Sequence, residues 1–376
     1  MSTSKLTPAQ KWILLAKAGG QCEFKGCKKF LYEDYLTKEN FNYGQYAHII
    51  ADSPKGPRGD DELSENLAKD LSNIMLLCPM HHKLIDTNVD NYPAEKLKLM
   101  KQEHEAHVRK MLSIGDDKEA TVIIYAANIG KQDCKINIGD ANQTILYYDY
   151  YPADSYPIEL GCRNSSLRDR NPLFWKVEEQ NLREKFDQLV ASQLATHRIK
   201  RMAIFALAPM PLLVLFGTLL TDKFDTTVYQ LHKEPQSWNW QEDNVQPFEI
   251  KYPDDKRGKP VLVFSLSSNI RERIEKLYAG ESISIWELTI PKPDNDYLRS
   301  KEQLSDFRQK VRAILEDINH HAAAGESIAI HMAMSVACAV ALGMVRNEKA
   351  DRGFKLYDYY NNEEKFALNI GINDYE

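Results

Sequence analysis

The sequence has 376 residues, of which 43% are hydrophobic and 27% are charged, and its net charge is −6. This length is too great for one ordinary domain, and the composition is that of a globular protein with apolar residues for more than one core. A negative net charge gives no overall attraction to nucleic acid, so any such binding must come from a local basic patch.

The apolar stretches do not indicate a membrane protein. The most apolar one, residues 202–220, contains two prolines and fits a buried strand followed by a helix. The N-terminal segment MSTSKLTPAQKW lacks the apolar core of a secretory signal. The six cysteines are sparse, so we expect reduced thiols or metal ligands and a cytoplasmic location.

Residues 1–115 are predicted to form a first domain. Thr7 and Pro8 are typical of a helix start. In chain order we expect a helix at 7–18, a turn with two cysteines at 19–30, a strand at 42–51, a polar loop at 53–66, an apolar segment at 73–77, a helix from Pro79 and a charged helix at 93–113.

Residues 116–165 are predicted to be a β-rich linker. The segments ATVIIYAA, CKINIG and TILYYDYY favour strands, arranged as a hairpin or small meander. In residues 166–376, segments with the sequence pattern of a strand alternate with segments that have the pattern of a helix. Strands are expected at 198–208, 259–268, 282–290 and 326–335, each followed by a helix. This alternation predicts parallel α/β units, which could be stacked as two halves.

Two close-spaced pairs of metal-ligand residues occur in the first domain. Cys22 and Cys27 are separated by four residues, and Cys78 and His81 by two. Two such pairs, each on a tight turn, suit a tetrahedral structural zinc, which would stabilise a domain too small for a large core. The alternative is that the cysteines are small buried hydrophobic residues.

Three further residues accompany these pairs: His48 in AHII, Asn73 before the second pair, and His82 directly after it. With these residues, the first domain resembles the HNH endonucleases of the ββα-metal type, an α+β fold with a structural zinc. The resemblance implies that His48 is the general base and that Asn73 orients it. It also implies that His82 binds a catalytic divalent ion such as Mg²⁺.

The second ligand of that ion is an open question. Many HNH nucleases carry a metal-binding residue just before the base, where this sequence has Ala47. Asp86 lies four residues after His82, on the same helical face, and could be a ligand or could orient His82. A solvated helix carboxylate is the alternative for Asp86, and Asp52 is a weaker candidate ligand.

Basic residues are concentrated near this motif. Contacts to DNA phosphates are expected from this group, although lysines are commonly only solvated. Its members are Lys25, Lys28, Lys29, Lys55, Arg58 and Lys83.

The α/β region offers candidate ligand-binding residues at turns where strands lead into helices, since helix N-termini suit phosphate. They also include the segment YQLHKEPQSWNWQED, whose two tryptophans could stack on bases or could belong to the core. The candidates are Lys233, Trp240, Ser267, Ser268, Met334 and Ser335.

The segments YQLHKEPQSWNWQ and IHMAMSVACAVALG resemble a SAVED domain, an α/β fold of two fused CARF/Rossmann-like units that binds cyclic oligonucleotides. The whole chain thus resembles the HNH-SAVED effectors of bacterial CBASS antiphage systems. The resemblance implies a double-stranded DNA endonuclease that is activated by a cyclic di- or trinucleotide and assembles into a dimer or tetramer. Two alternatives are a non-catalytic zinc-containing DNA-binding regulator and a constitutive nuclease.

Overall fold

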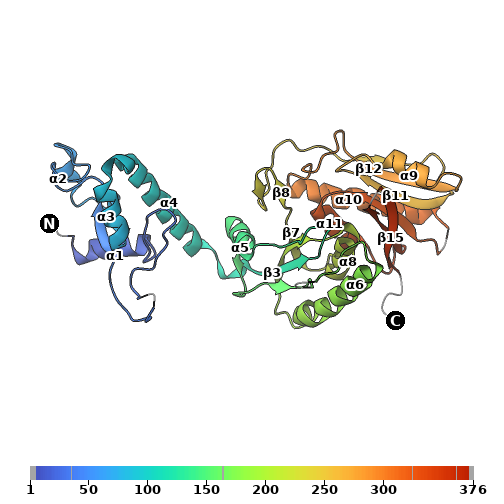
Figure 1. The fold of residues 1–376 in the computed structure, drawn as a ribbon, viewed down its shortest axis with the longest axis horizontal. Coiled ribbons are helices and arrows are strands. Elements are labelled where there is room, and N and C mark those ends of the chain that lie inside the picture. Colours follow the sequence, from blue (N-terminus) through green and yellow to red (C-terminus); the bar gives the residue numbers. More distant parts are fainter. Residues whose placement is uncertain (1–5, 35, 163–164, 324, 361, 372–376) are drawn as a thin grey trace. The chain divides into compact units, whose positions relative to one another are not determined.

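The structure, a computed structural model, describes residues 6–34, 36–162, 165–323, 325–360 and 362–371. The chain forms two compact units, residues 1–115 and 116–376 (Figure 1). Within the described residues, no helix combines the length and the apolar character needed to cross a membrane.

The first unit contains an antiparallel pair of strands and several helices. Its elements are α1 (Pro8–Lys17), β1 (Gln45–His48), α2 (Leu63–Leu67), the 3-10 turn η1 (Leu71–Asn73), β2 (Ile74–Leu77), α3 (Pro79–Thr87), the 3-10 turn η2 (Val89–Asn91) and α4 (Ala94–Ser113). β1 pairs with β2 so that His48 lies opposite Ile74. Every residue of β2 is buried, and this strand is the centre of a small core.

Local sequence signals set the helix starts in this unit. The Thr7 hydroxyl accepts the N–H of Gln10, and the Gln10 side chain accepts the N–H of Thr7, which forms a capping box at α1. Pro79 is the first residue of α3, where its missing N–H costs no hydrogen bond. The helix α4 begins within one residue of the predicted start.

The first half of the second unit is a parallel sheet with the order β4-β3-β6-β7, in which β5 also pairs with β3. Its elements are η3 (Asp116–Lys118), β3 (Glu119–Ala126), α5 (Ile138–Tyr147), β4 (Tyr151–Pro152), β5 (Ile158–Glu159), α6 (Pro172–Phe186), the π-helical turn η4 (Asp187–Ala191), α7 (Ser192–Ala195), β6 (Arg201–Leu207), α8 (Met210–Leu220) and β7 (Asp225–Val228). A hairpin of β8 (His232–Lys233) and β9 (Gln236–Ser237) follows.

The expected linker at 116–165 needs correction in two respects. Its strand β3 is a central strand of the second unit, because it pairs with β6 along six residues. The segment expected to be its last strand, TILYYDYY, begins with the last four residues of helix α5, whose first N–H groups are capped by the Asn137 side chain. Ala141, Thr144 and Ile145 are buried at helical spacing, so tertiary burial favours the helix over the β propensity of the tyrosines.

The second half is a mixed sheet with the order β10-β12-β11-β13-β14-β15, whose two edge strands are antiparallel to their neighbours. Its elements are β10 (Glu249–Lys251), β11 (Lys259–Ser265), α9 (Arg271–Leu277), β12 (Ile283–Thr289), α10 (Lys301–His321), β13 (Ile328–Ala333), α11 (Val336–Val345), β14 (Phe354–Tyr360) and β15 (Glu363–Ile370). The predicted α/β alternation is present here.

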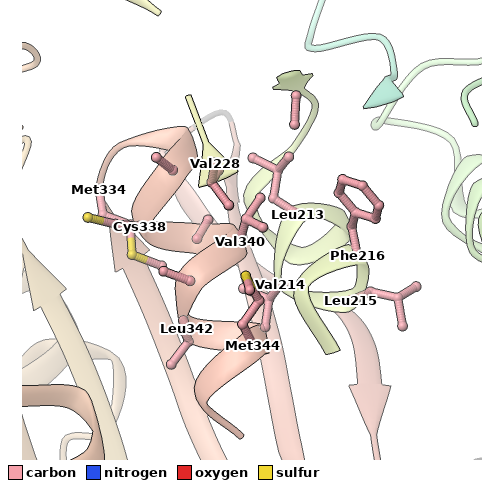
Figure 2. Packing of buried hydrophobic residues seen from close by; sticks show 14 of the residues in the cluster. Leu213, Val214, Leu215, Phe216, Val228, Met334, Cys338, Val340, Leu342 and Met344 are labelled. Carbon is pink, nitrogen blue, oxygen red and sulfur yellow. The ribbon is translucent and has the colours of Figure 1, made fainter. Parts of the chain in front are cut away.

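The two halves share one topology once the edge strands β10 and β15 are set aside and the short strands β4 and β5, which both pair with β3, are counted as one. In each sheet the first parallel strand lies between the second and the third, and the fourth lies beyond the third. The helix after the third strand is α8 in one half and α11 in the other. These two helices pack against each other in the core, with apolar side chains from both (Figure 2). The expectation of two α/β halves therefore agrees with the structure.

Candidate functional site

Four ligand atoms meet in the first unit. The thiols of Cys22, Cys27 and Cys78 and a ring nitrogen of His81 all lie within 4.8 Å of one another. His81 Nδ1 is 3.2 Å from Cys78 Sγ and 3.7 Å from Cys22 Sγ. Three sulfurs and one imidazole at this spacing fit a tetrahedral zinc ion.

The surroundings of this cluster fix its geometry. The ring of Phe24 stacks on His81 with the centroids 4.0 Å apart and the planes 3° apart. Burial raises the pKa of the Cys22 thiol to about 12, and it lowers the pKa of His81. Buried thiols of raised pKa need a cation to become thiolates, which is the charge that a bound zinc ion supplies.

His48 and Asn73 are placed by hydrogen bonds to the backbone. His48, half-buried at the end of β1, has its Nε2 3.0 Å from the carbonyl oxygen of Ala68. The buried Asn73 side chain accepts the N–H of Ile50 at 2.9 Å and donates to the Ile50 carbonyl at 2.8 Å. Asn73 therefore holds the backbone two residues after His48, and no hydrogen bond to the imidazole itself is seen among the described residues.

His82 points away from the thiol cluster, unlike its neighbour His81. Its Nδ1 lies 2.7 Å from Gln45 Oε1 on β1, and its Nε2 lies 3.3 Å from Asp86 Oδ2 on α3. The other carboxylate oxygen of Asp86 accepts a hydrogen bond from Arg58 at 2.8 Å. Burial raises the pKa of Asp86, but hydrogen bonds from His82 and Arg58 outweigh this effect and leave its pKa below the usual value.

The basic group divides into exposed and buried members. The five lysines are exposed, and Lys25 forms an ion pair with Glu103 at 3.2 Å. Arg58 is different, because its side chain is 4% exposed and its guanidinium bonds to protein groups. The engagement of its guanidinium by protein groups argues against the predicted contact of Arg58 with DNA phosphate. Its structural role, and that of Gln45, had no signal in the sequence.

The candidate ligand residues of the second unit do not form one exposed group. Trp240, Met334 and Ser335 are buried, and Ser335 Oγ accepts a hydrogen bond from Tyr297. The sequence left open whether the two tryptophans stack on bases or belong to the core. Trp238 is buried as well as Trp240, so both belong to the core. The other three candidates lie at the surface, with Lys233 and Ser268 exposed and Ser267 half-buried.

A cavity lies instead at the carboxyl end of β3. Its volume is 630 Å³, and its polar lining includes Asn128, Lys135, Ser165 and Arg168. A second cavity of 550 Å³ shares Lys135 and lies along α5 and the β8–β9 hairpin. Ligands of open α/β sheets bind at the carboxyl ends of strands. If residues 116–165 had been assigned to the α/β sheet and not to a linker, this rule would have predicted the residues that line the first cavity.

The comparison with protein families found one match. The family is described as SAVED, the SMODS-associated and fused to various effectors sensor domain, and residues 182–372 match it.

The chain belongs to the SAVED family. The first unit and strand β3 lie outside the matched residues, although β3 is part of the same sheet as β6. The SAVED sheet of this chain therefore includes residues before the matched region.

Solved structures of SAVED/CARF-domain receptors are similar to this chain at low identity. The Acinetobacter baumannii Cap4 receptor with the cyclic trinucleotide 3'3'3'-cAAA is 11% identical with a TM-score of 0.43, and its complex with 2'3'3'-cAAA is 13% identical with a TM-score of 0.40. Both matches cover 83% of this chain and 67% of Cap4. Moraxella osloensis Cap4 is 10% identical with a TM-score of 0.38, covering 81% of this chain and 66% of that receptor. The comparison with curated proteins found no match.

Proposed function

We propose that this protein is a metal-dependent endonuclease for double-stranded DNA that is switched on by a cyclic oligonucleotide bound to its SAVED domain. One observation supports the nuclease most: His48 at a strand end and the His82–Asp86 pair on α3 belong to one small unit. In bacteria such a protein would act as an antiviral effector that degrades DNA.

His48 has the geometry of a general base. A carbonyl oxygen only accepts hydrogen bonds, so the contact with Ala68 places the imidazole proton on Nε2. The lone pair is then on Nδ1, which takes a proton from the attacking water as the oxygen bonds to phosphorus. Asn73 maintains the backbone from which the imidazole projects.

His82 and Asp86 fit a divalent cation. Their Nε2 and Oδ2 atoms are 3.3 Å apart, close to the separation of about 3 Å between adjacent ligands of an octahedral Mg²⁺. The cation would supply Lewis-acid stabilisation of charge on the scissile phosphate and the leaving oxygen. The Cys22, Cys27, Cys78 and His81 cluster would hold a separate structural zinc.

The sensor role of the SAVED domain supports the proposed regulation, because the family is described as fused to various effectors. Cyclic oligonucleotides are the ligand class that the resemblance implies, and cyclic trinucleotides are named in the Cap4 structures. Binding can activate the enzyme only by favouring an active state over an inactive one. We propose that this state is a dimer or a tetramer, in which two nuclease sites reach both strands.

The first experiment measures cleavage of supercoiled plasmid by the full chain with Mg²⁺. The panel of cyclic di- and trinucleotides includes both cAAA isomers, and light scattering records the oligomeric state. We expect cleavage only with Mg²⁺ and one member of the panel. His48→Ala should reduce the cleavage rate by about 10²–10⁴-fold, the usual contribution of a general base.

The matched control is His320→Ala, which removes an exposed histidine of the second unit and should leave cleavage unchanged. Undiminished cutting by His48→Ala would reject the assigned base. Equal cutting without any messenger would reject the regulation and favour a constitutive nuclease.

A non-catalytic DNA-binding regulator is the competing function. The buried Ala47 and the engagement of Asp86 by Arg58 favour it, because both reduce the ligands open to a catalytic ion. Messenger-dependent DNA binding with no cleavage under any divalent ion would support this regulator.

A further inference from the structure

The charged side chain of Arg58 is 4% exposed and contacts the segments that carry the proposed catalytic residues, and its backbone has a φ of +55°. Residues with a Cβ rarely adopt this left-handed conformation, and they do so where the surrounding structure imposes it. Burying a guanidinium is unfavourable unless its N–H groups are hydrogen-bonded. The position of this side chain therefore depends on its partners.

Those partners come from two separate elements. Arg58 Nε donates to the carbonyl oxygen of Ile49 at 2.6 Å, and Nη2 lies 3.5 Å from that of His48. On the other side, Nη1 donates to the carbonyl oxygen of Ile85 at 2.7 Å, and Nη2 donates to Asp86 at 2.8 Å. One planar group thus joins the end of β1 to the helix α3.

The carboxylate that Arg58 holds is the one that faces His82. Asp86 Oδ1 is bound by Arg58, which leaves Oδ2 directed at His82 Nε2. Without the guanidinium, the Asp86 carboxylate could rotate about its side-chain bonds. The carbonyl oxygen of Ile49, next to His48, would also lose its hydrogen-bond donor. The contacts connect the proposed base and the proposed metal ligands through one residue.

We propose that Arg58 is a positioning residue, which holds His48 and the His82–Asp86 pair in the relative geometry that a divalent cation and a phosphate require. This inference rests on the proposed nuclease function. Arg58 would act by orienting its neighbours and not by contacting the substrate, because its N–H groups are directed at protein atoms.

The test uses full-length Arg58→Met, in which the apolar chain remains and the fork of donors is lost. Arg58→Lys is the second variant, because a single ammonium group keeps the charge but cannot make four divergent contacts. Zinc content reports the integrity of the thiol cluster. Mn²⁺ binding is followed by the loss of the free-ion electron paramagnetic resonance signal, and plasmid cleavage is measured with Mg²⁺.

We expect both variants to retain zinc and to bind Mn²⁺ about 10–100-fold more weakly, as for other residues that orient metal ligands. Cleavage should fall with the loss of affinity and recover in part at high Mg²⁺. Binding to a short DNA duplex in EDTA should keep the wild-type dependence on salt. Arg109→Met, which removes an exposed guanidinium from helix α4 of the same unit, is the matched control and should keep wild-type Mn²⁺ affinity.

Three results would overturn the inference. Unchanged Mn²⁺ affinity with a salt dependence reduced by about one phosphate contact would make Arg58 a DNA contact. Full restoration by Arg58→Lys would show that charge alone suffices. Loss of zinc in both variants would make Arg58 a general stabiliser of the unit. If the wild type binds Mn²⁺ but never cuts DNA, the proposed function fails, while the Mn²⁺ measurements still decide the role of Arg58.

Discussion

At the scale of single residues, Asp358 shows how burial and neighbouring charges act together. It lies on β14, and burial together with the nearby carboxylates of Asp169 and Glu364 raises its pKa to about 7. The unfolded chain has the ordinary pKa of about 4. Between these two values the unfolded state releases a proton that the folded state keeps, so stability falls as pH rises.

We therefore predict that Asp358→Asn becomes progressively more stable than the wild type as pH rises from about 4 to about 7. The difference should stay constant above pH 7, where both states of the wild type are ionised. Calorimetry of the full chain at several pH values measures this difference. Asp254→Asn, at an exposed carboxylate, is the control, and an equal pH dependence in both variants would contradict the assignment.

At the scale of elements, the contact between α8 and α11 joins the two halves of the SAVED domain. Gly217 and Gly343 let the helices approach closely, because a Cβ at Gly217 would overlap the carbonyl oxygen of Val340. A Cβ at Gly343 would overlap the carbonyl oxygen of Val214 in the same way. Backbone atoms cannot yield as a flexible side chain can, so the whole helices would have to separate.

Gly343→Ala is accordingly predicted to destabilise the SAVED domain by about 2–3 kcal/mol or more, the cost of inserting an atom into a packed core. The unfolding transition of this domain in the full chain provides the measurement. Gly139→Ala is the matched control, because its added Cβ would meet only the Asn137 side chain, at 3.1 Å. Similar losses of stability in both variants would argue against the close helix approach.

At the scale of the whole molecule, the chain has two units with different sources of stability. The SAVED domain contains a large apolar core between its sheets, whereas the first unit has a small core next to the thiol cluster. Small domains gain much of their folding free energy from a bound structural metal. Metal removal should therefore affect the two units unequally.

Cys78→Ser should lose zinc and lower the unfolding temperature of the first unit, while the transition of the SAVED domain stays in place. A strong chelator added to the wild type should have the same effect. Cys134→Ser, outside the cluster, should retain zinc as the matched control. Metal analysis and calorimetry of the full chain provide the readouts, and an unchanged first transition without zinc would contradict the structural role.

The sequence by itself determined the features that depend on local spacing. The Thr7 cap, the Pro79 helix start and the α/β alternation after residue 198 all report interactions within a few residues of the chain, and these elements agree with the structure. The two ligand pairs of the thiol cluster have spacings that suit one ion, and the fold brings all four residues together.

Only the tertiary structure decided which distant groups meet. Arg58 and Asp86 are 28 residues apart, and a guanidinium in a polar loop has the same sequence pattern whether it contacts DNA or a buried carboxylate. The helix α5, the burial of Trp240 and the cavity beside β3 likewise depend on packing against remote strands. Periodicity records which face of an element is apolar, but it carries no information on the partner that covers this face.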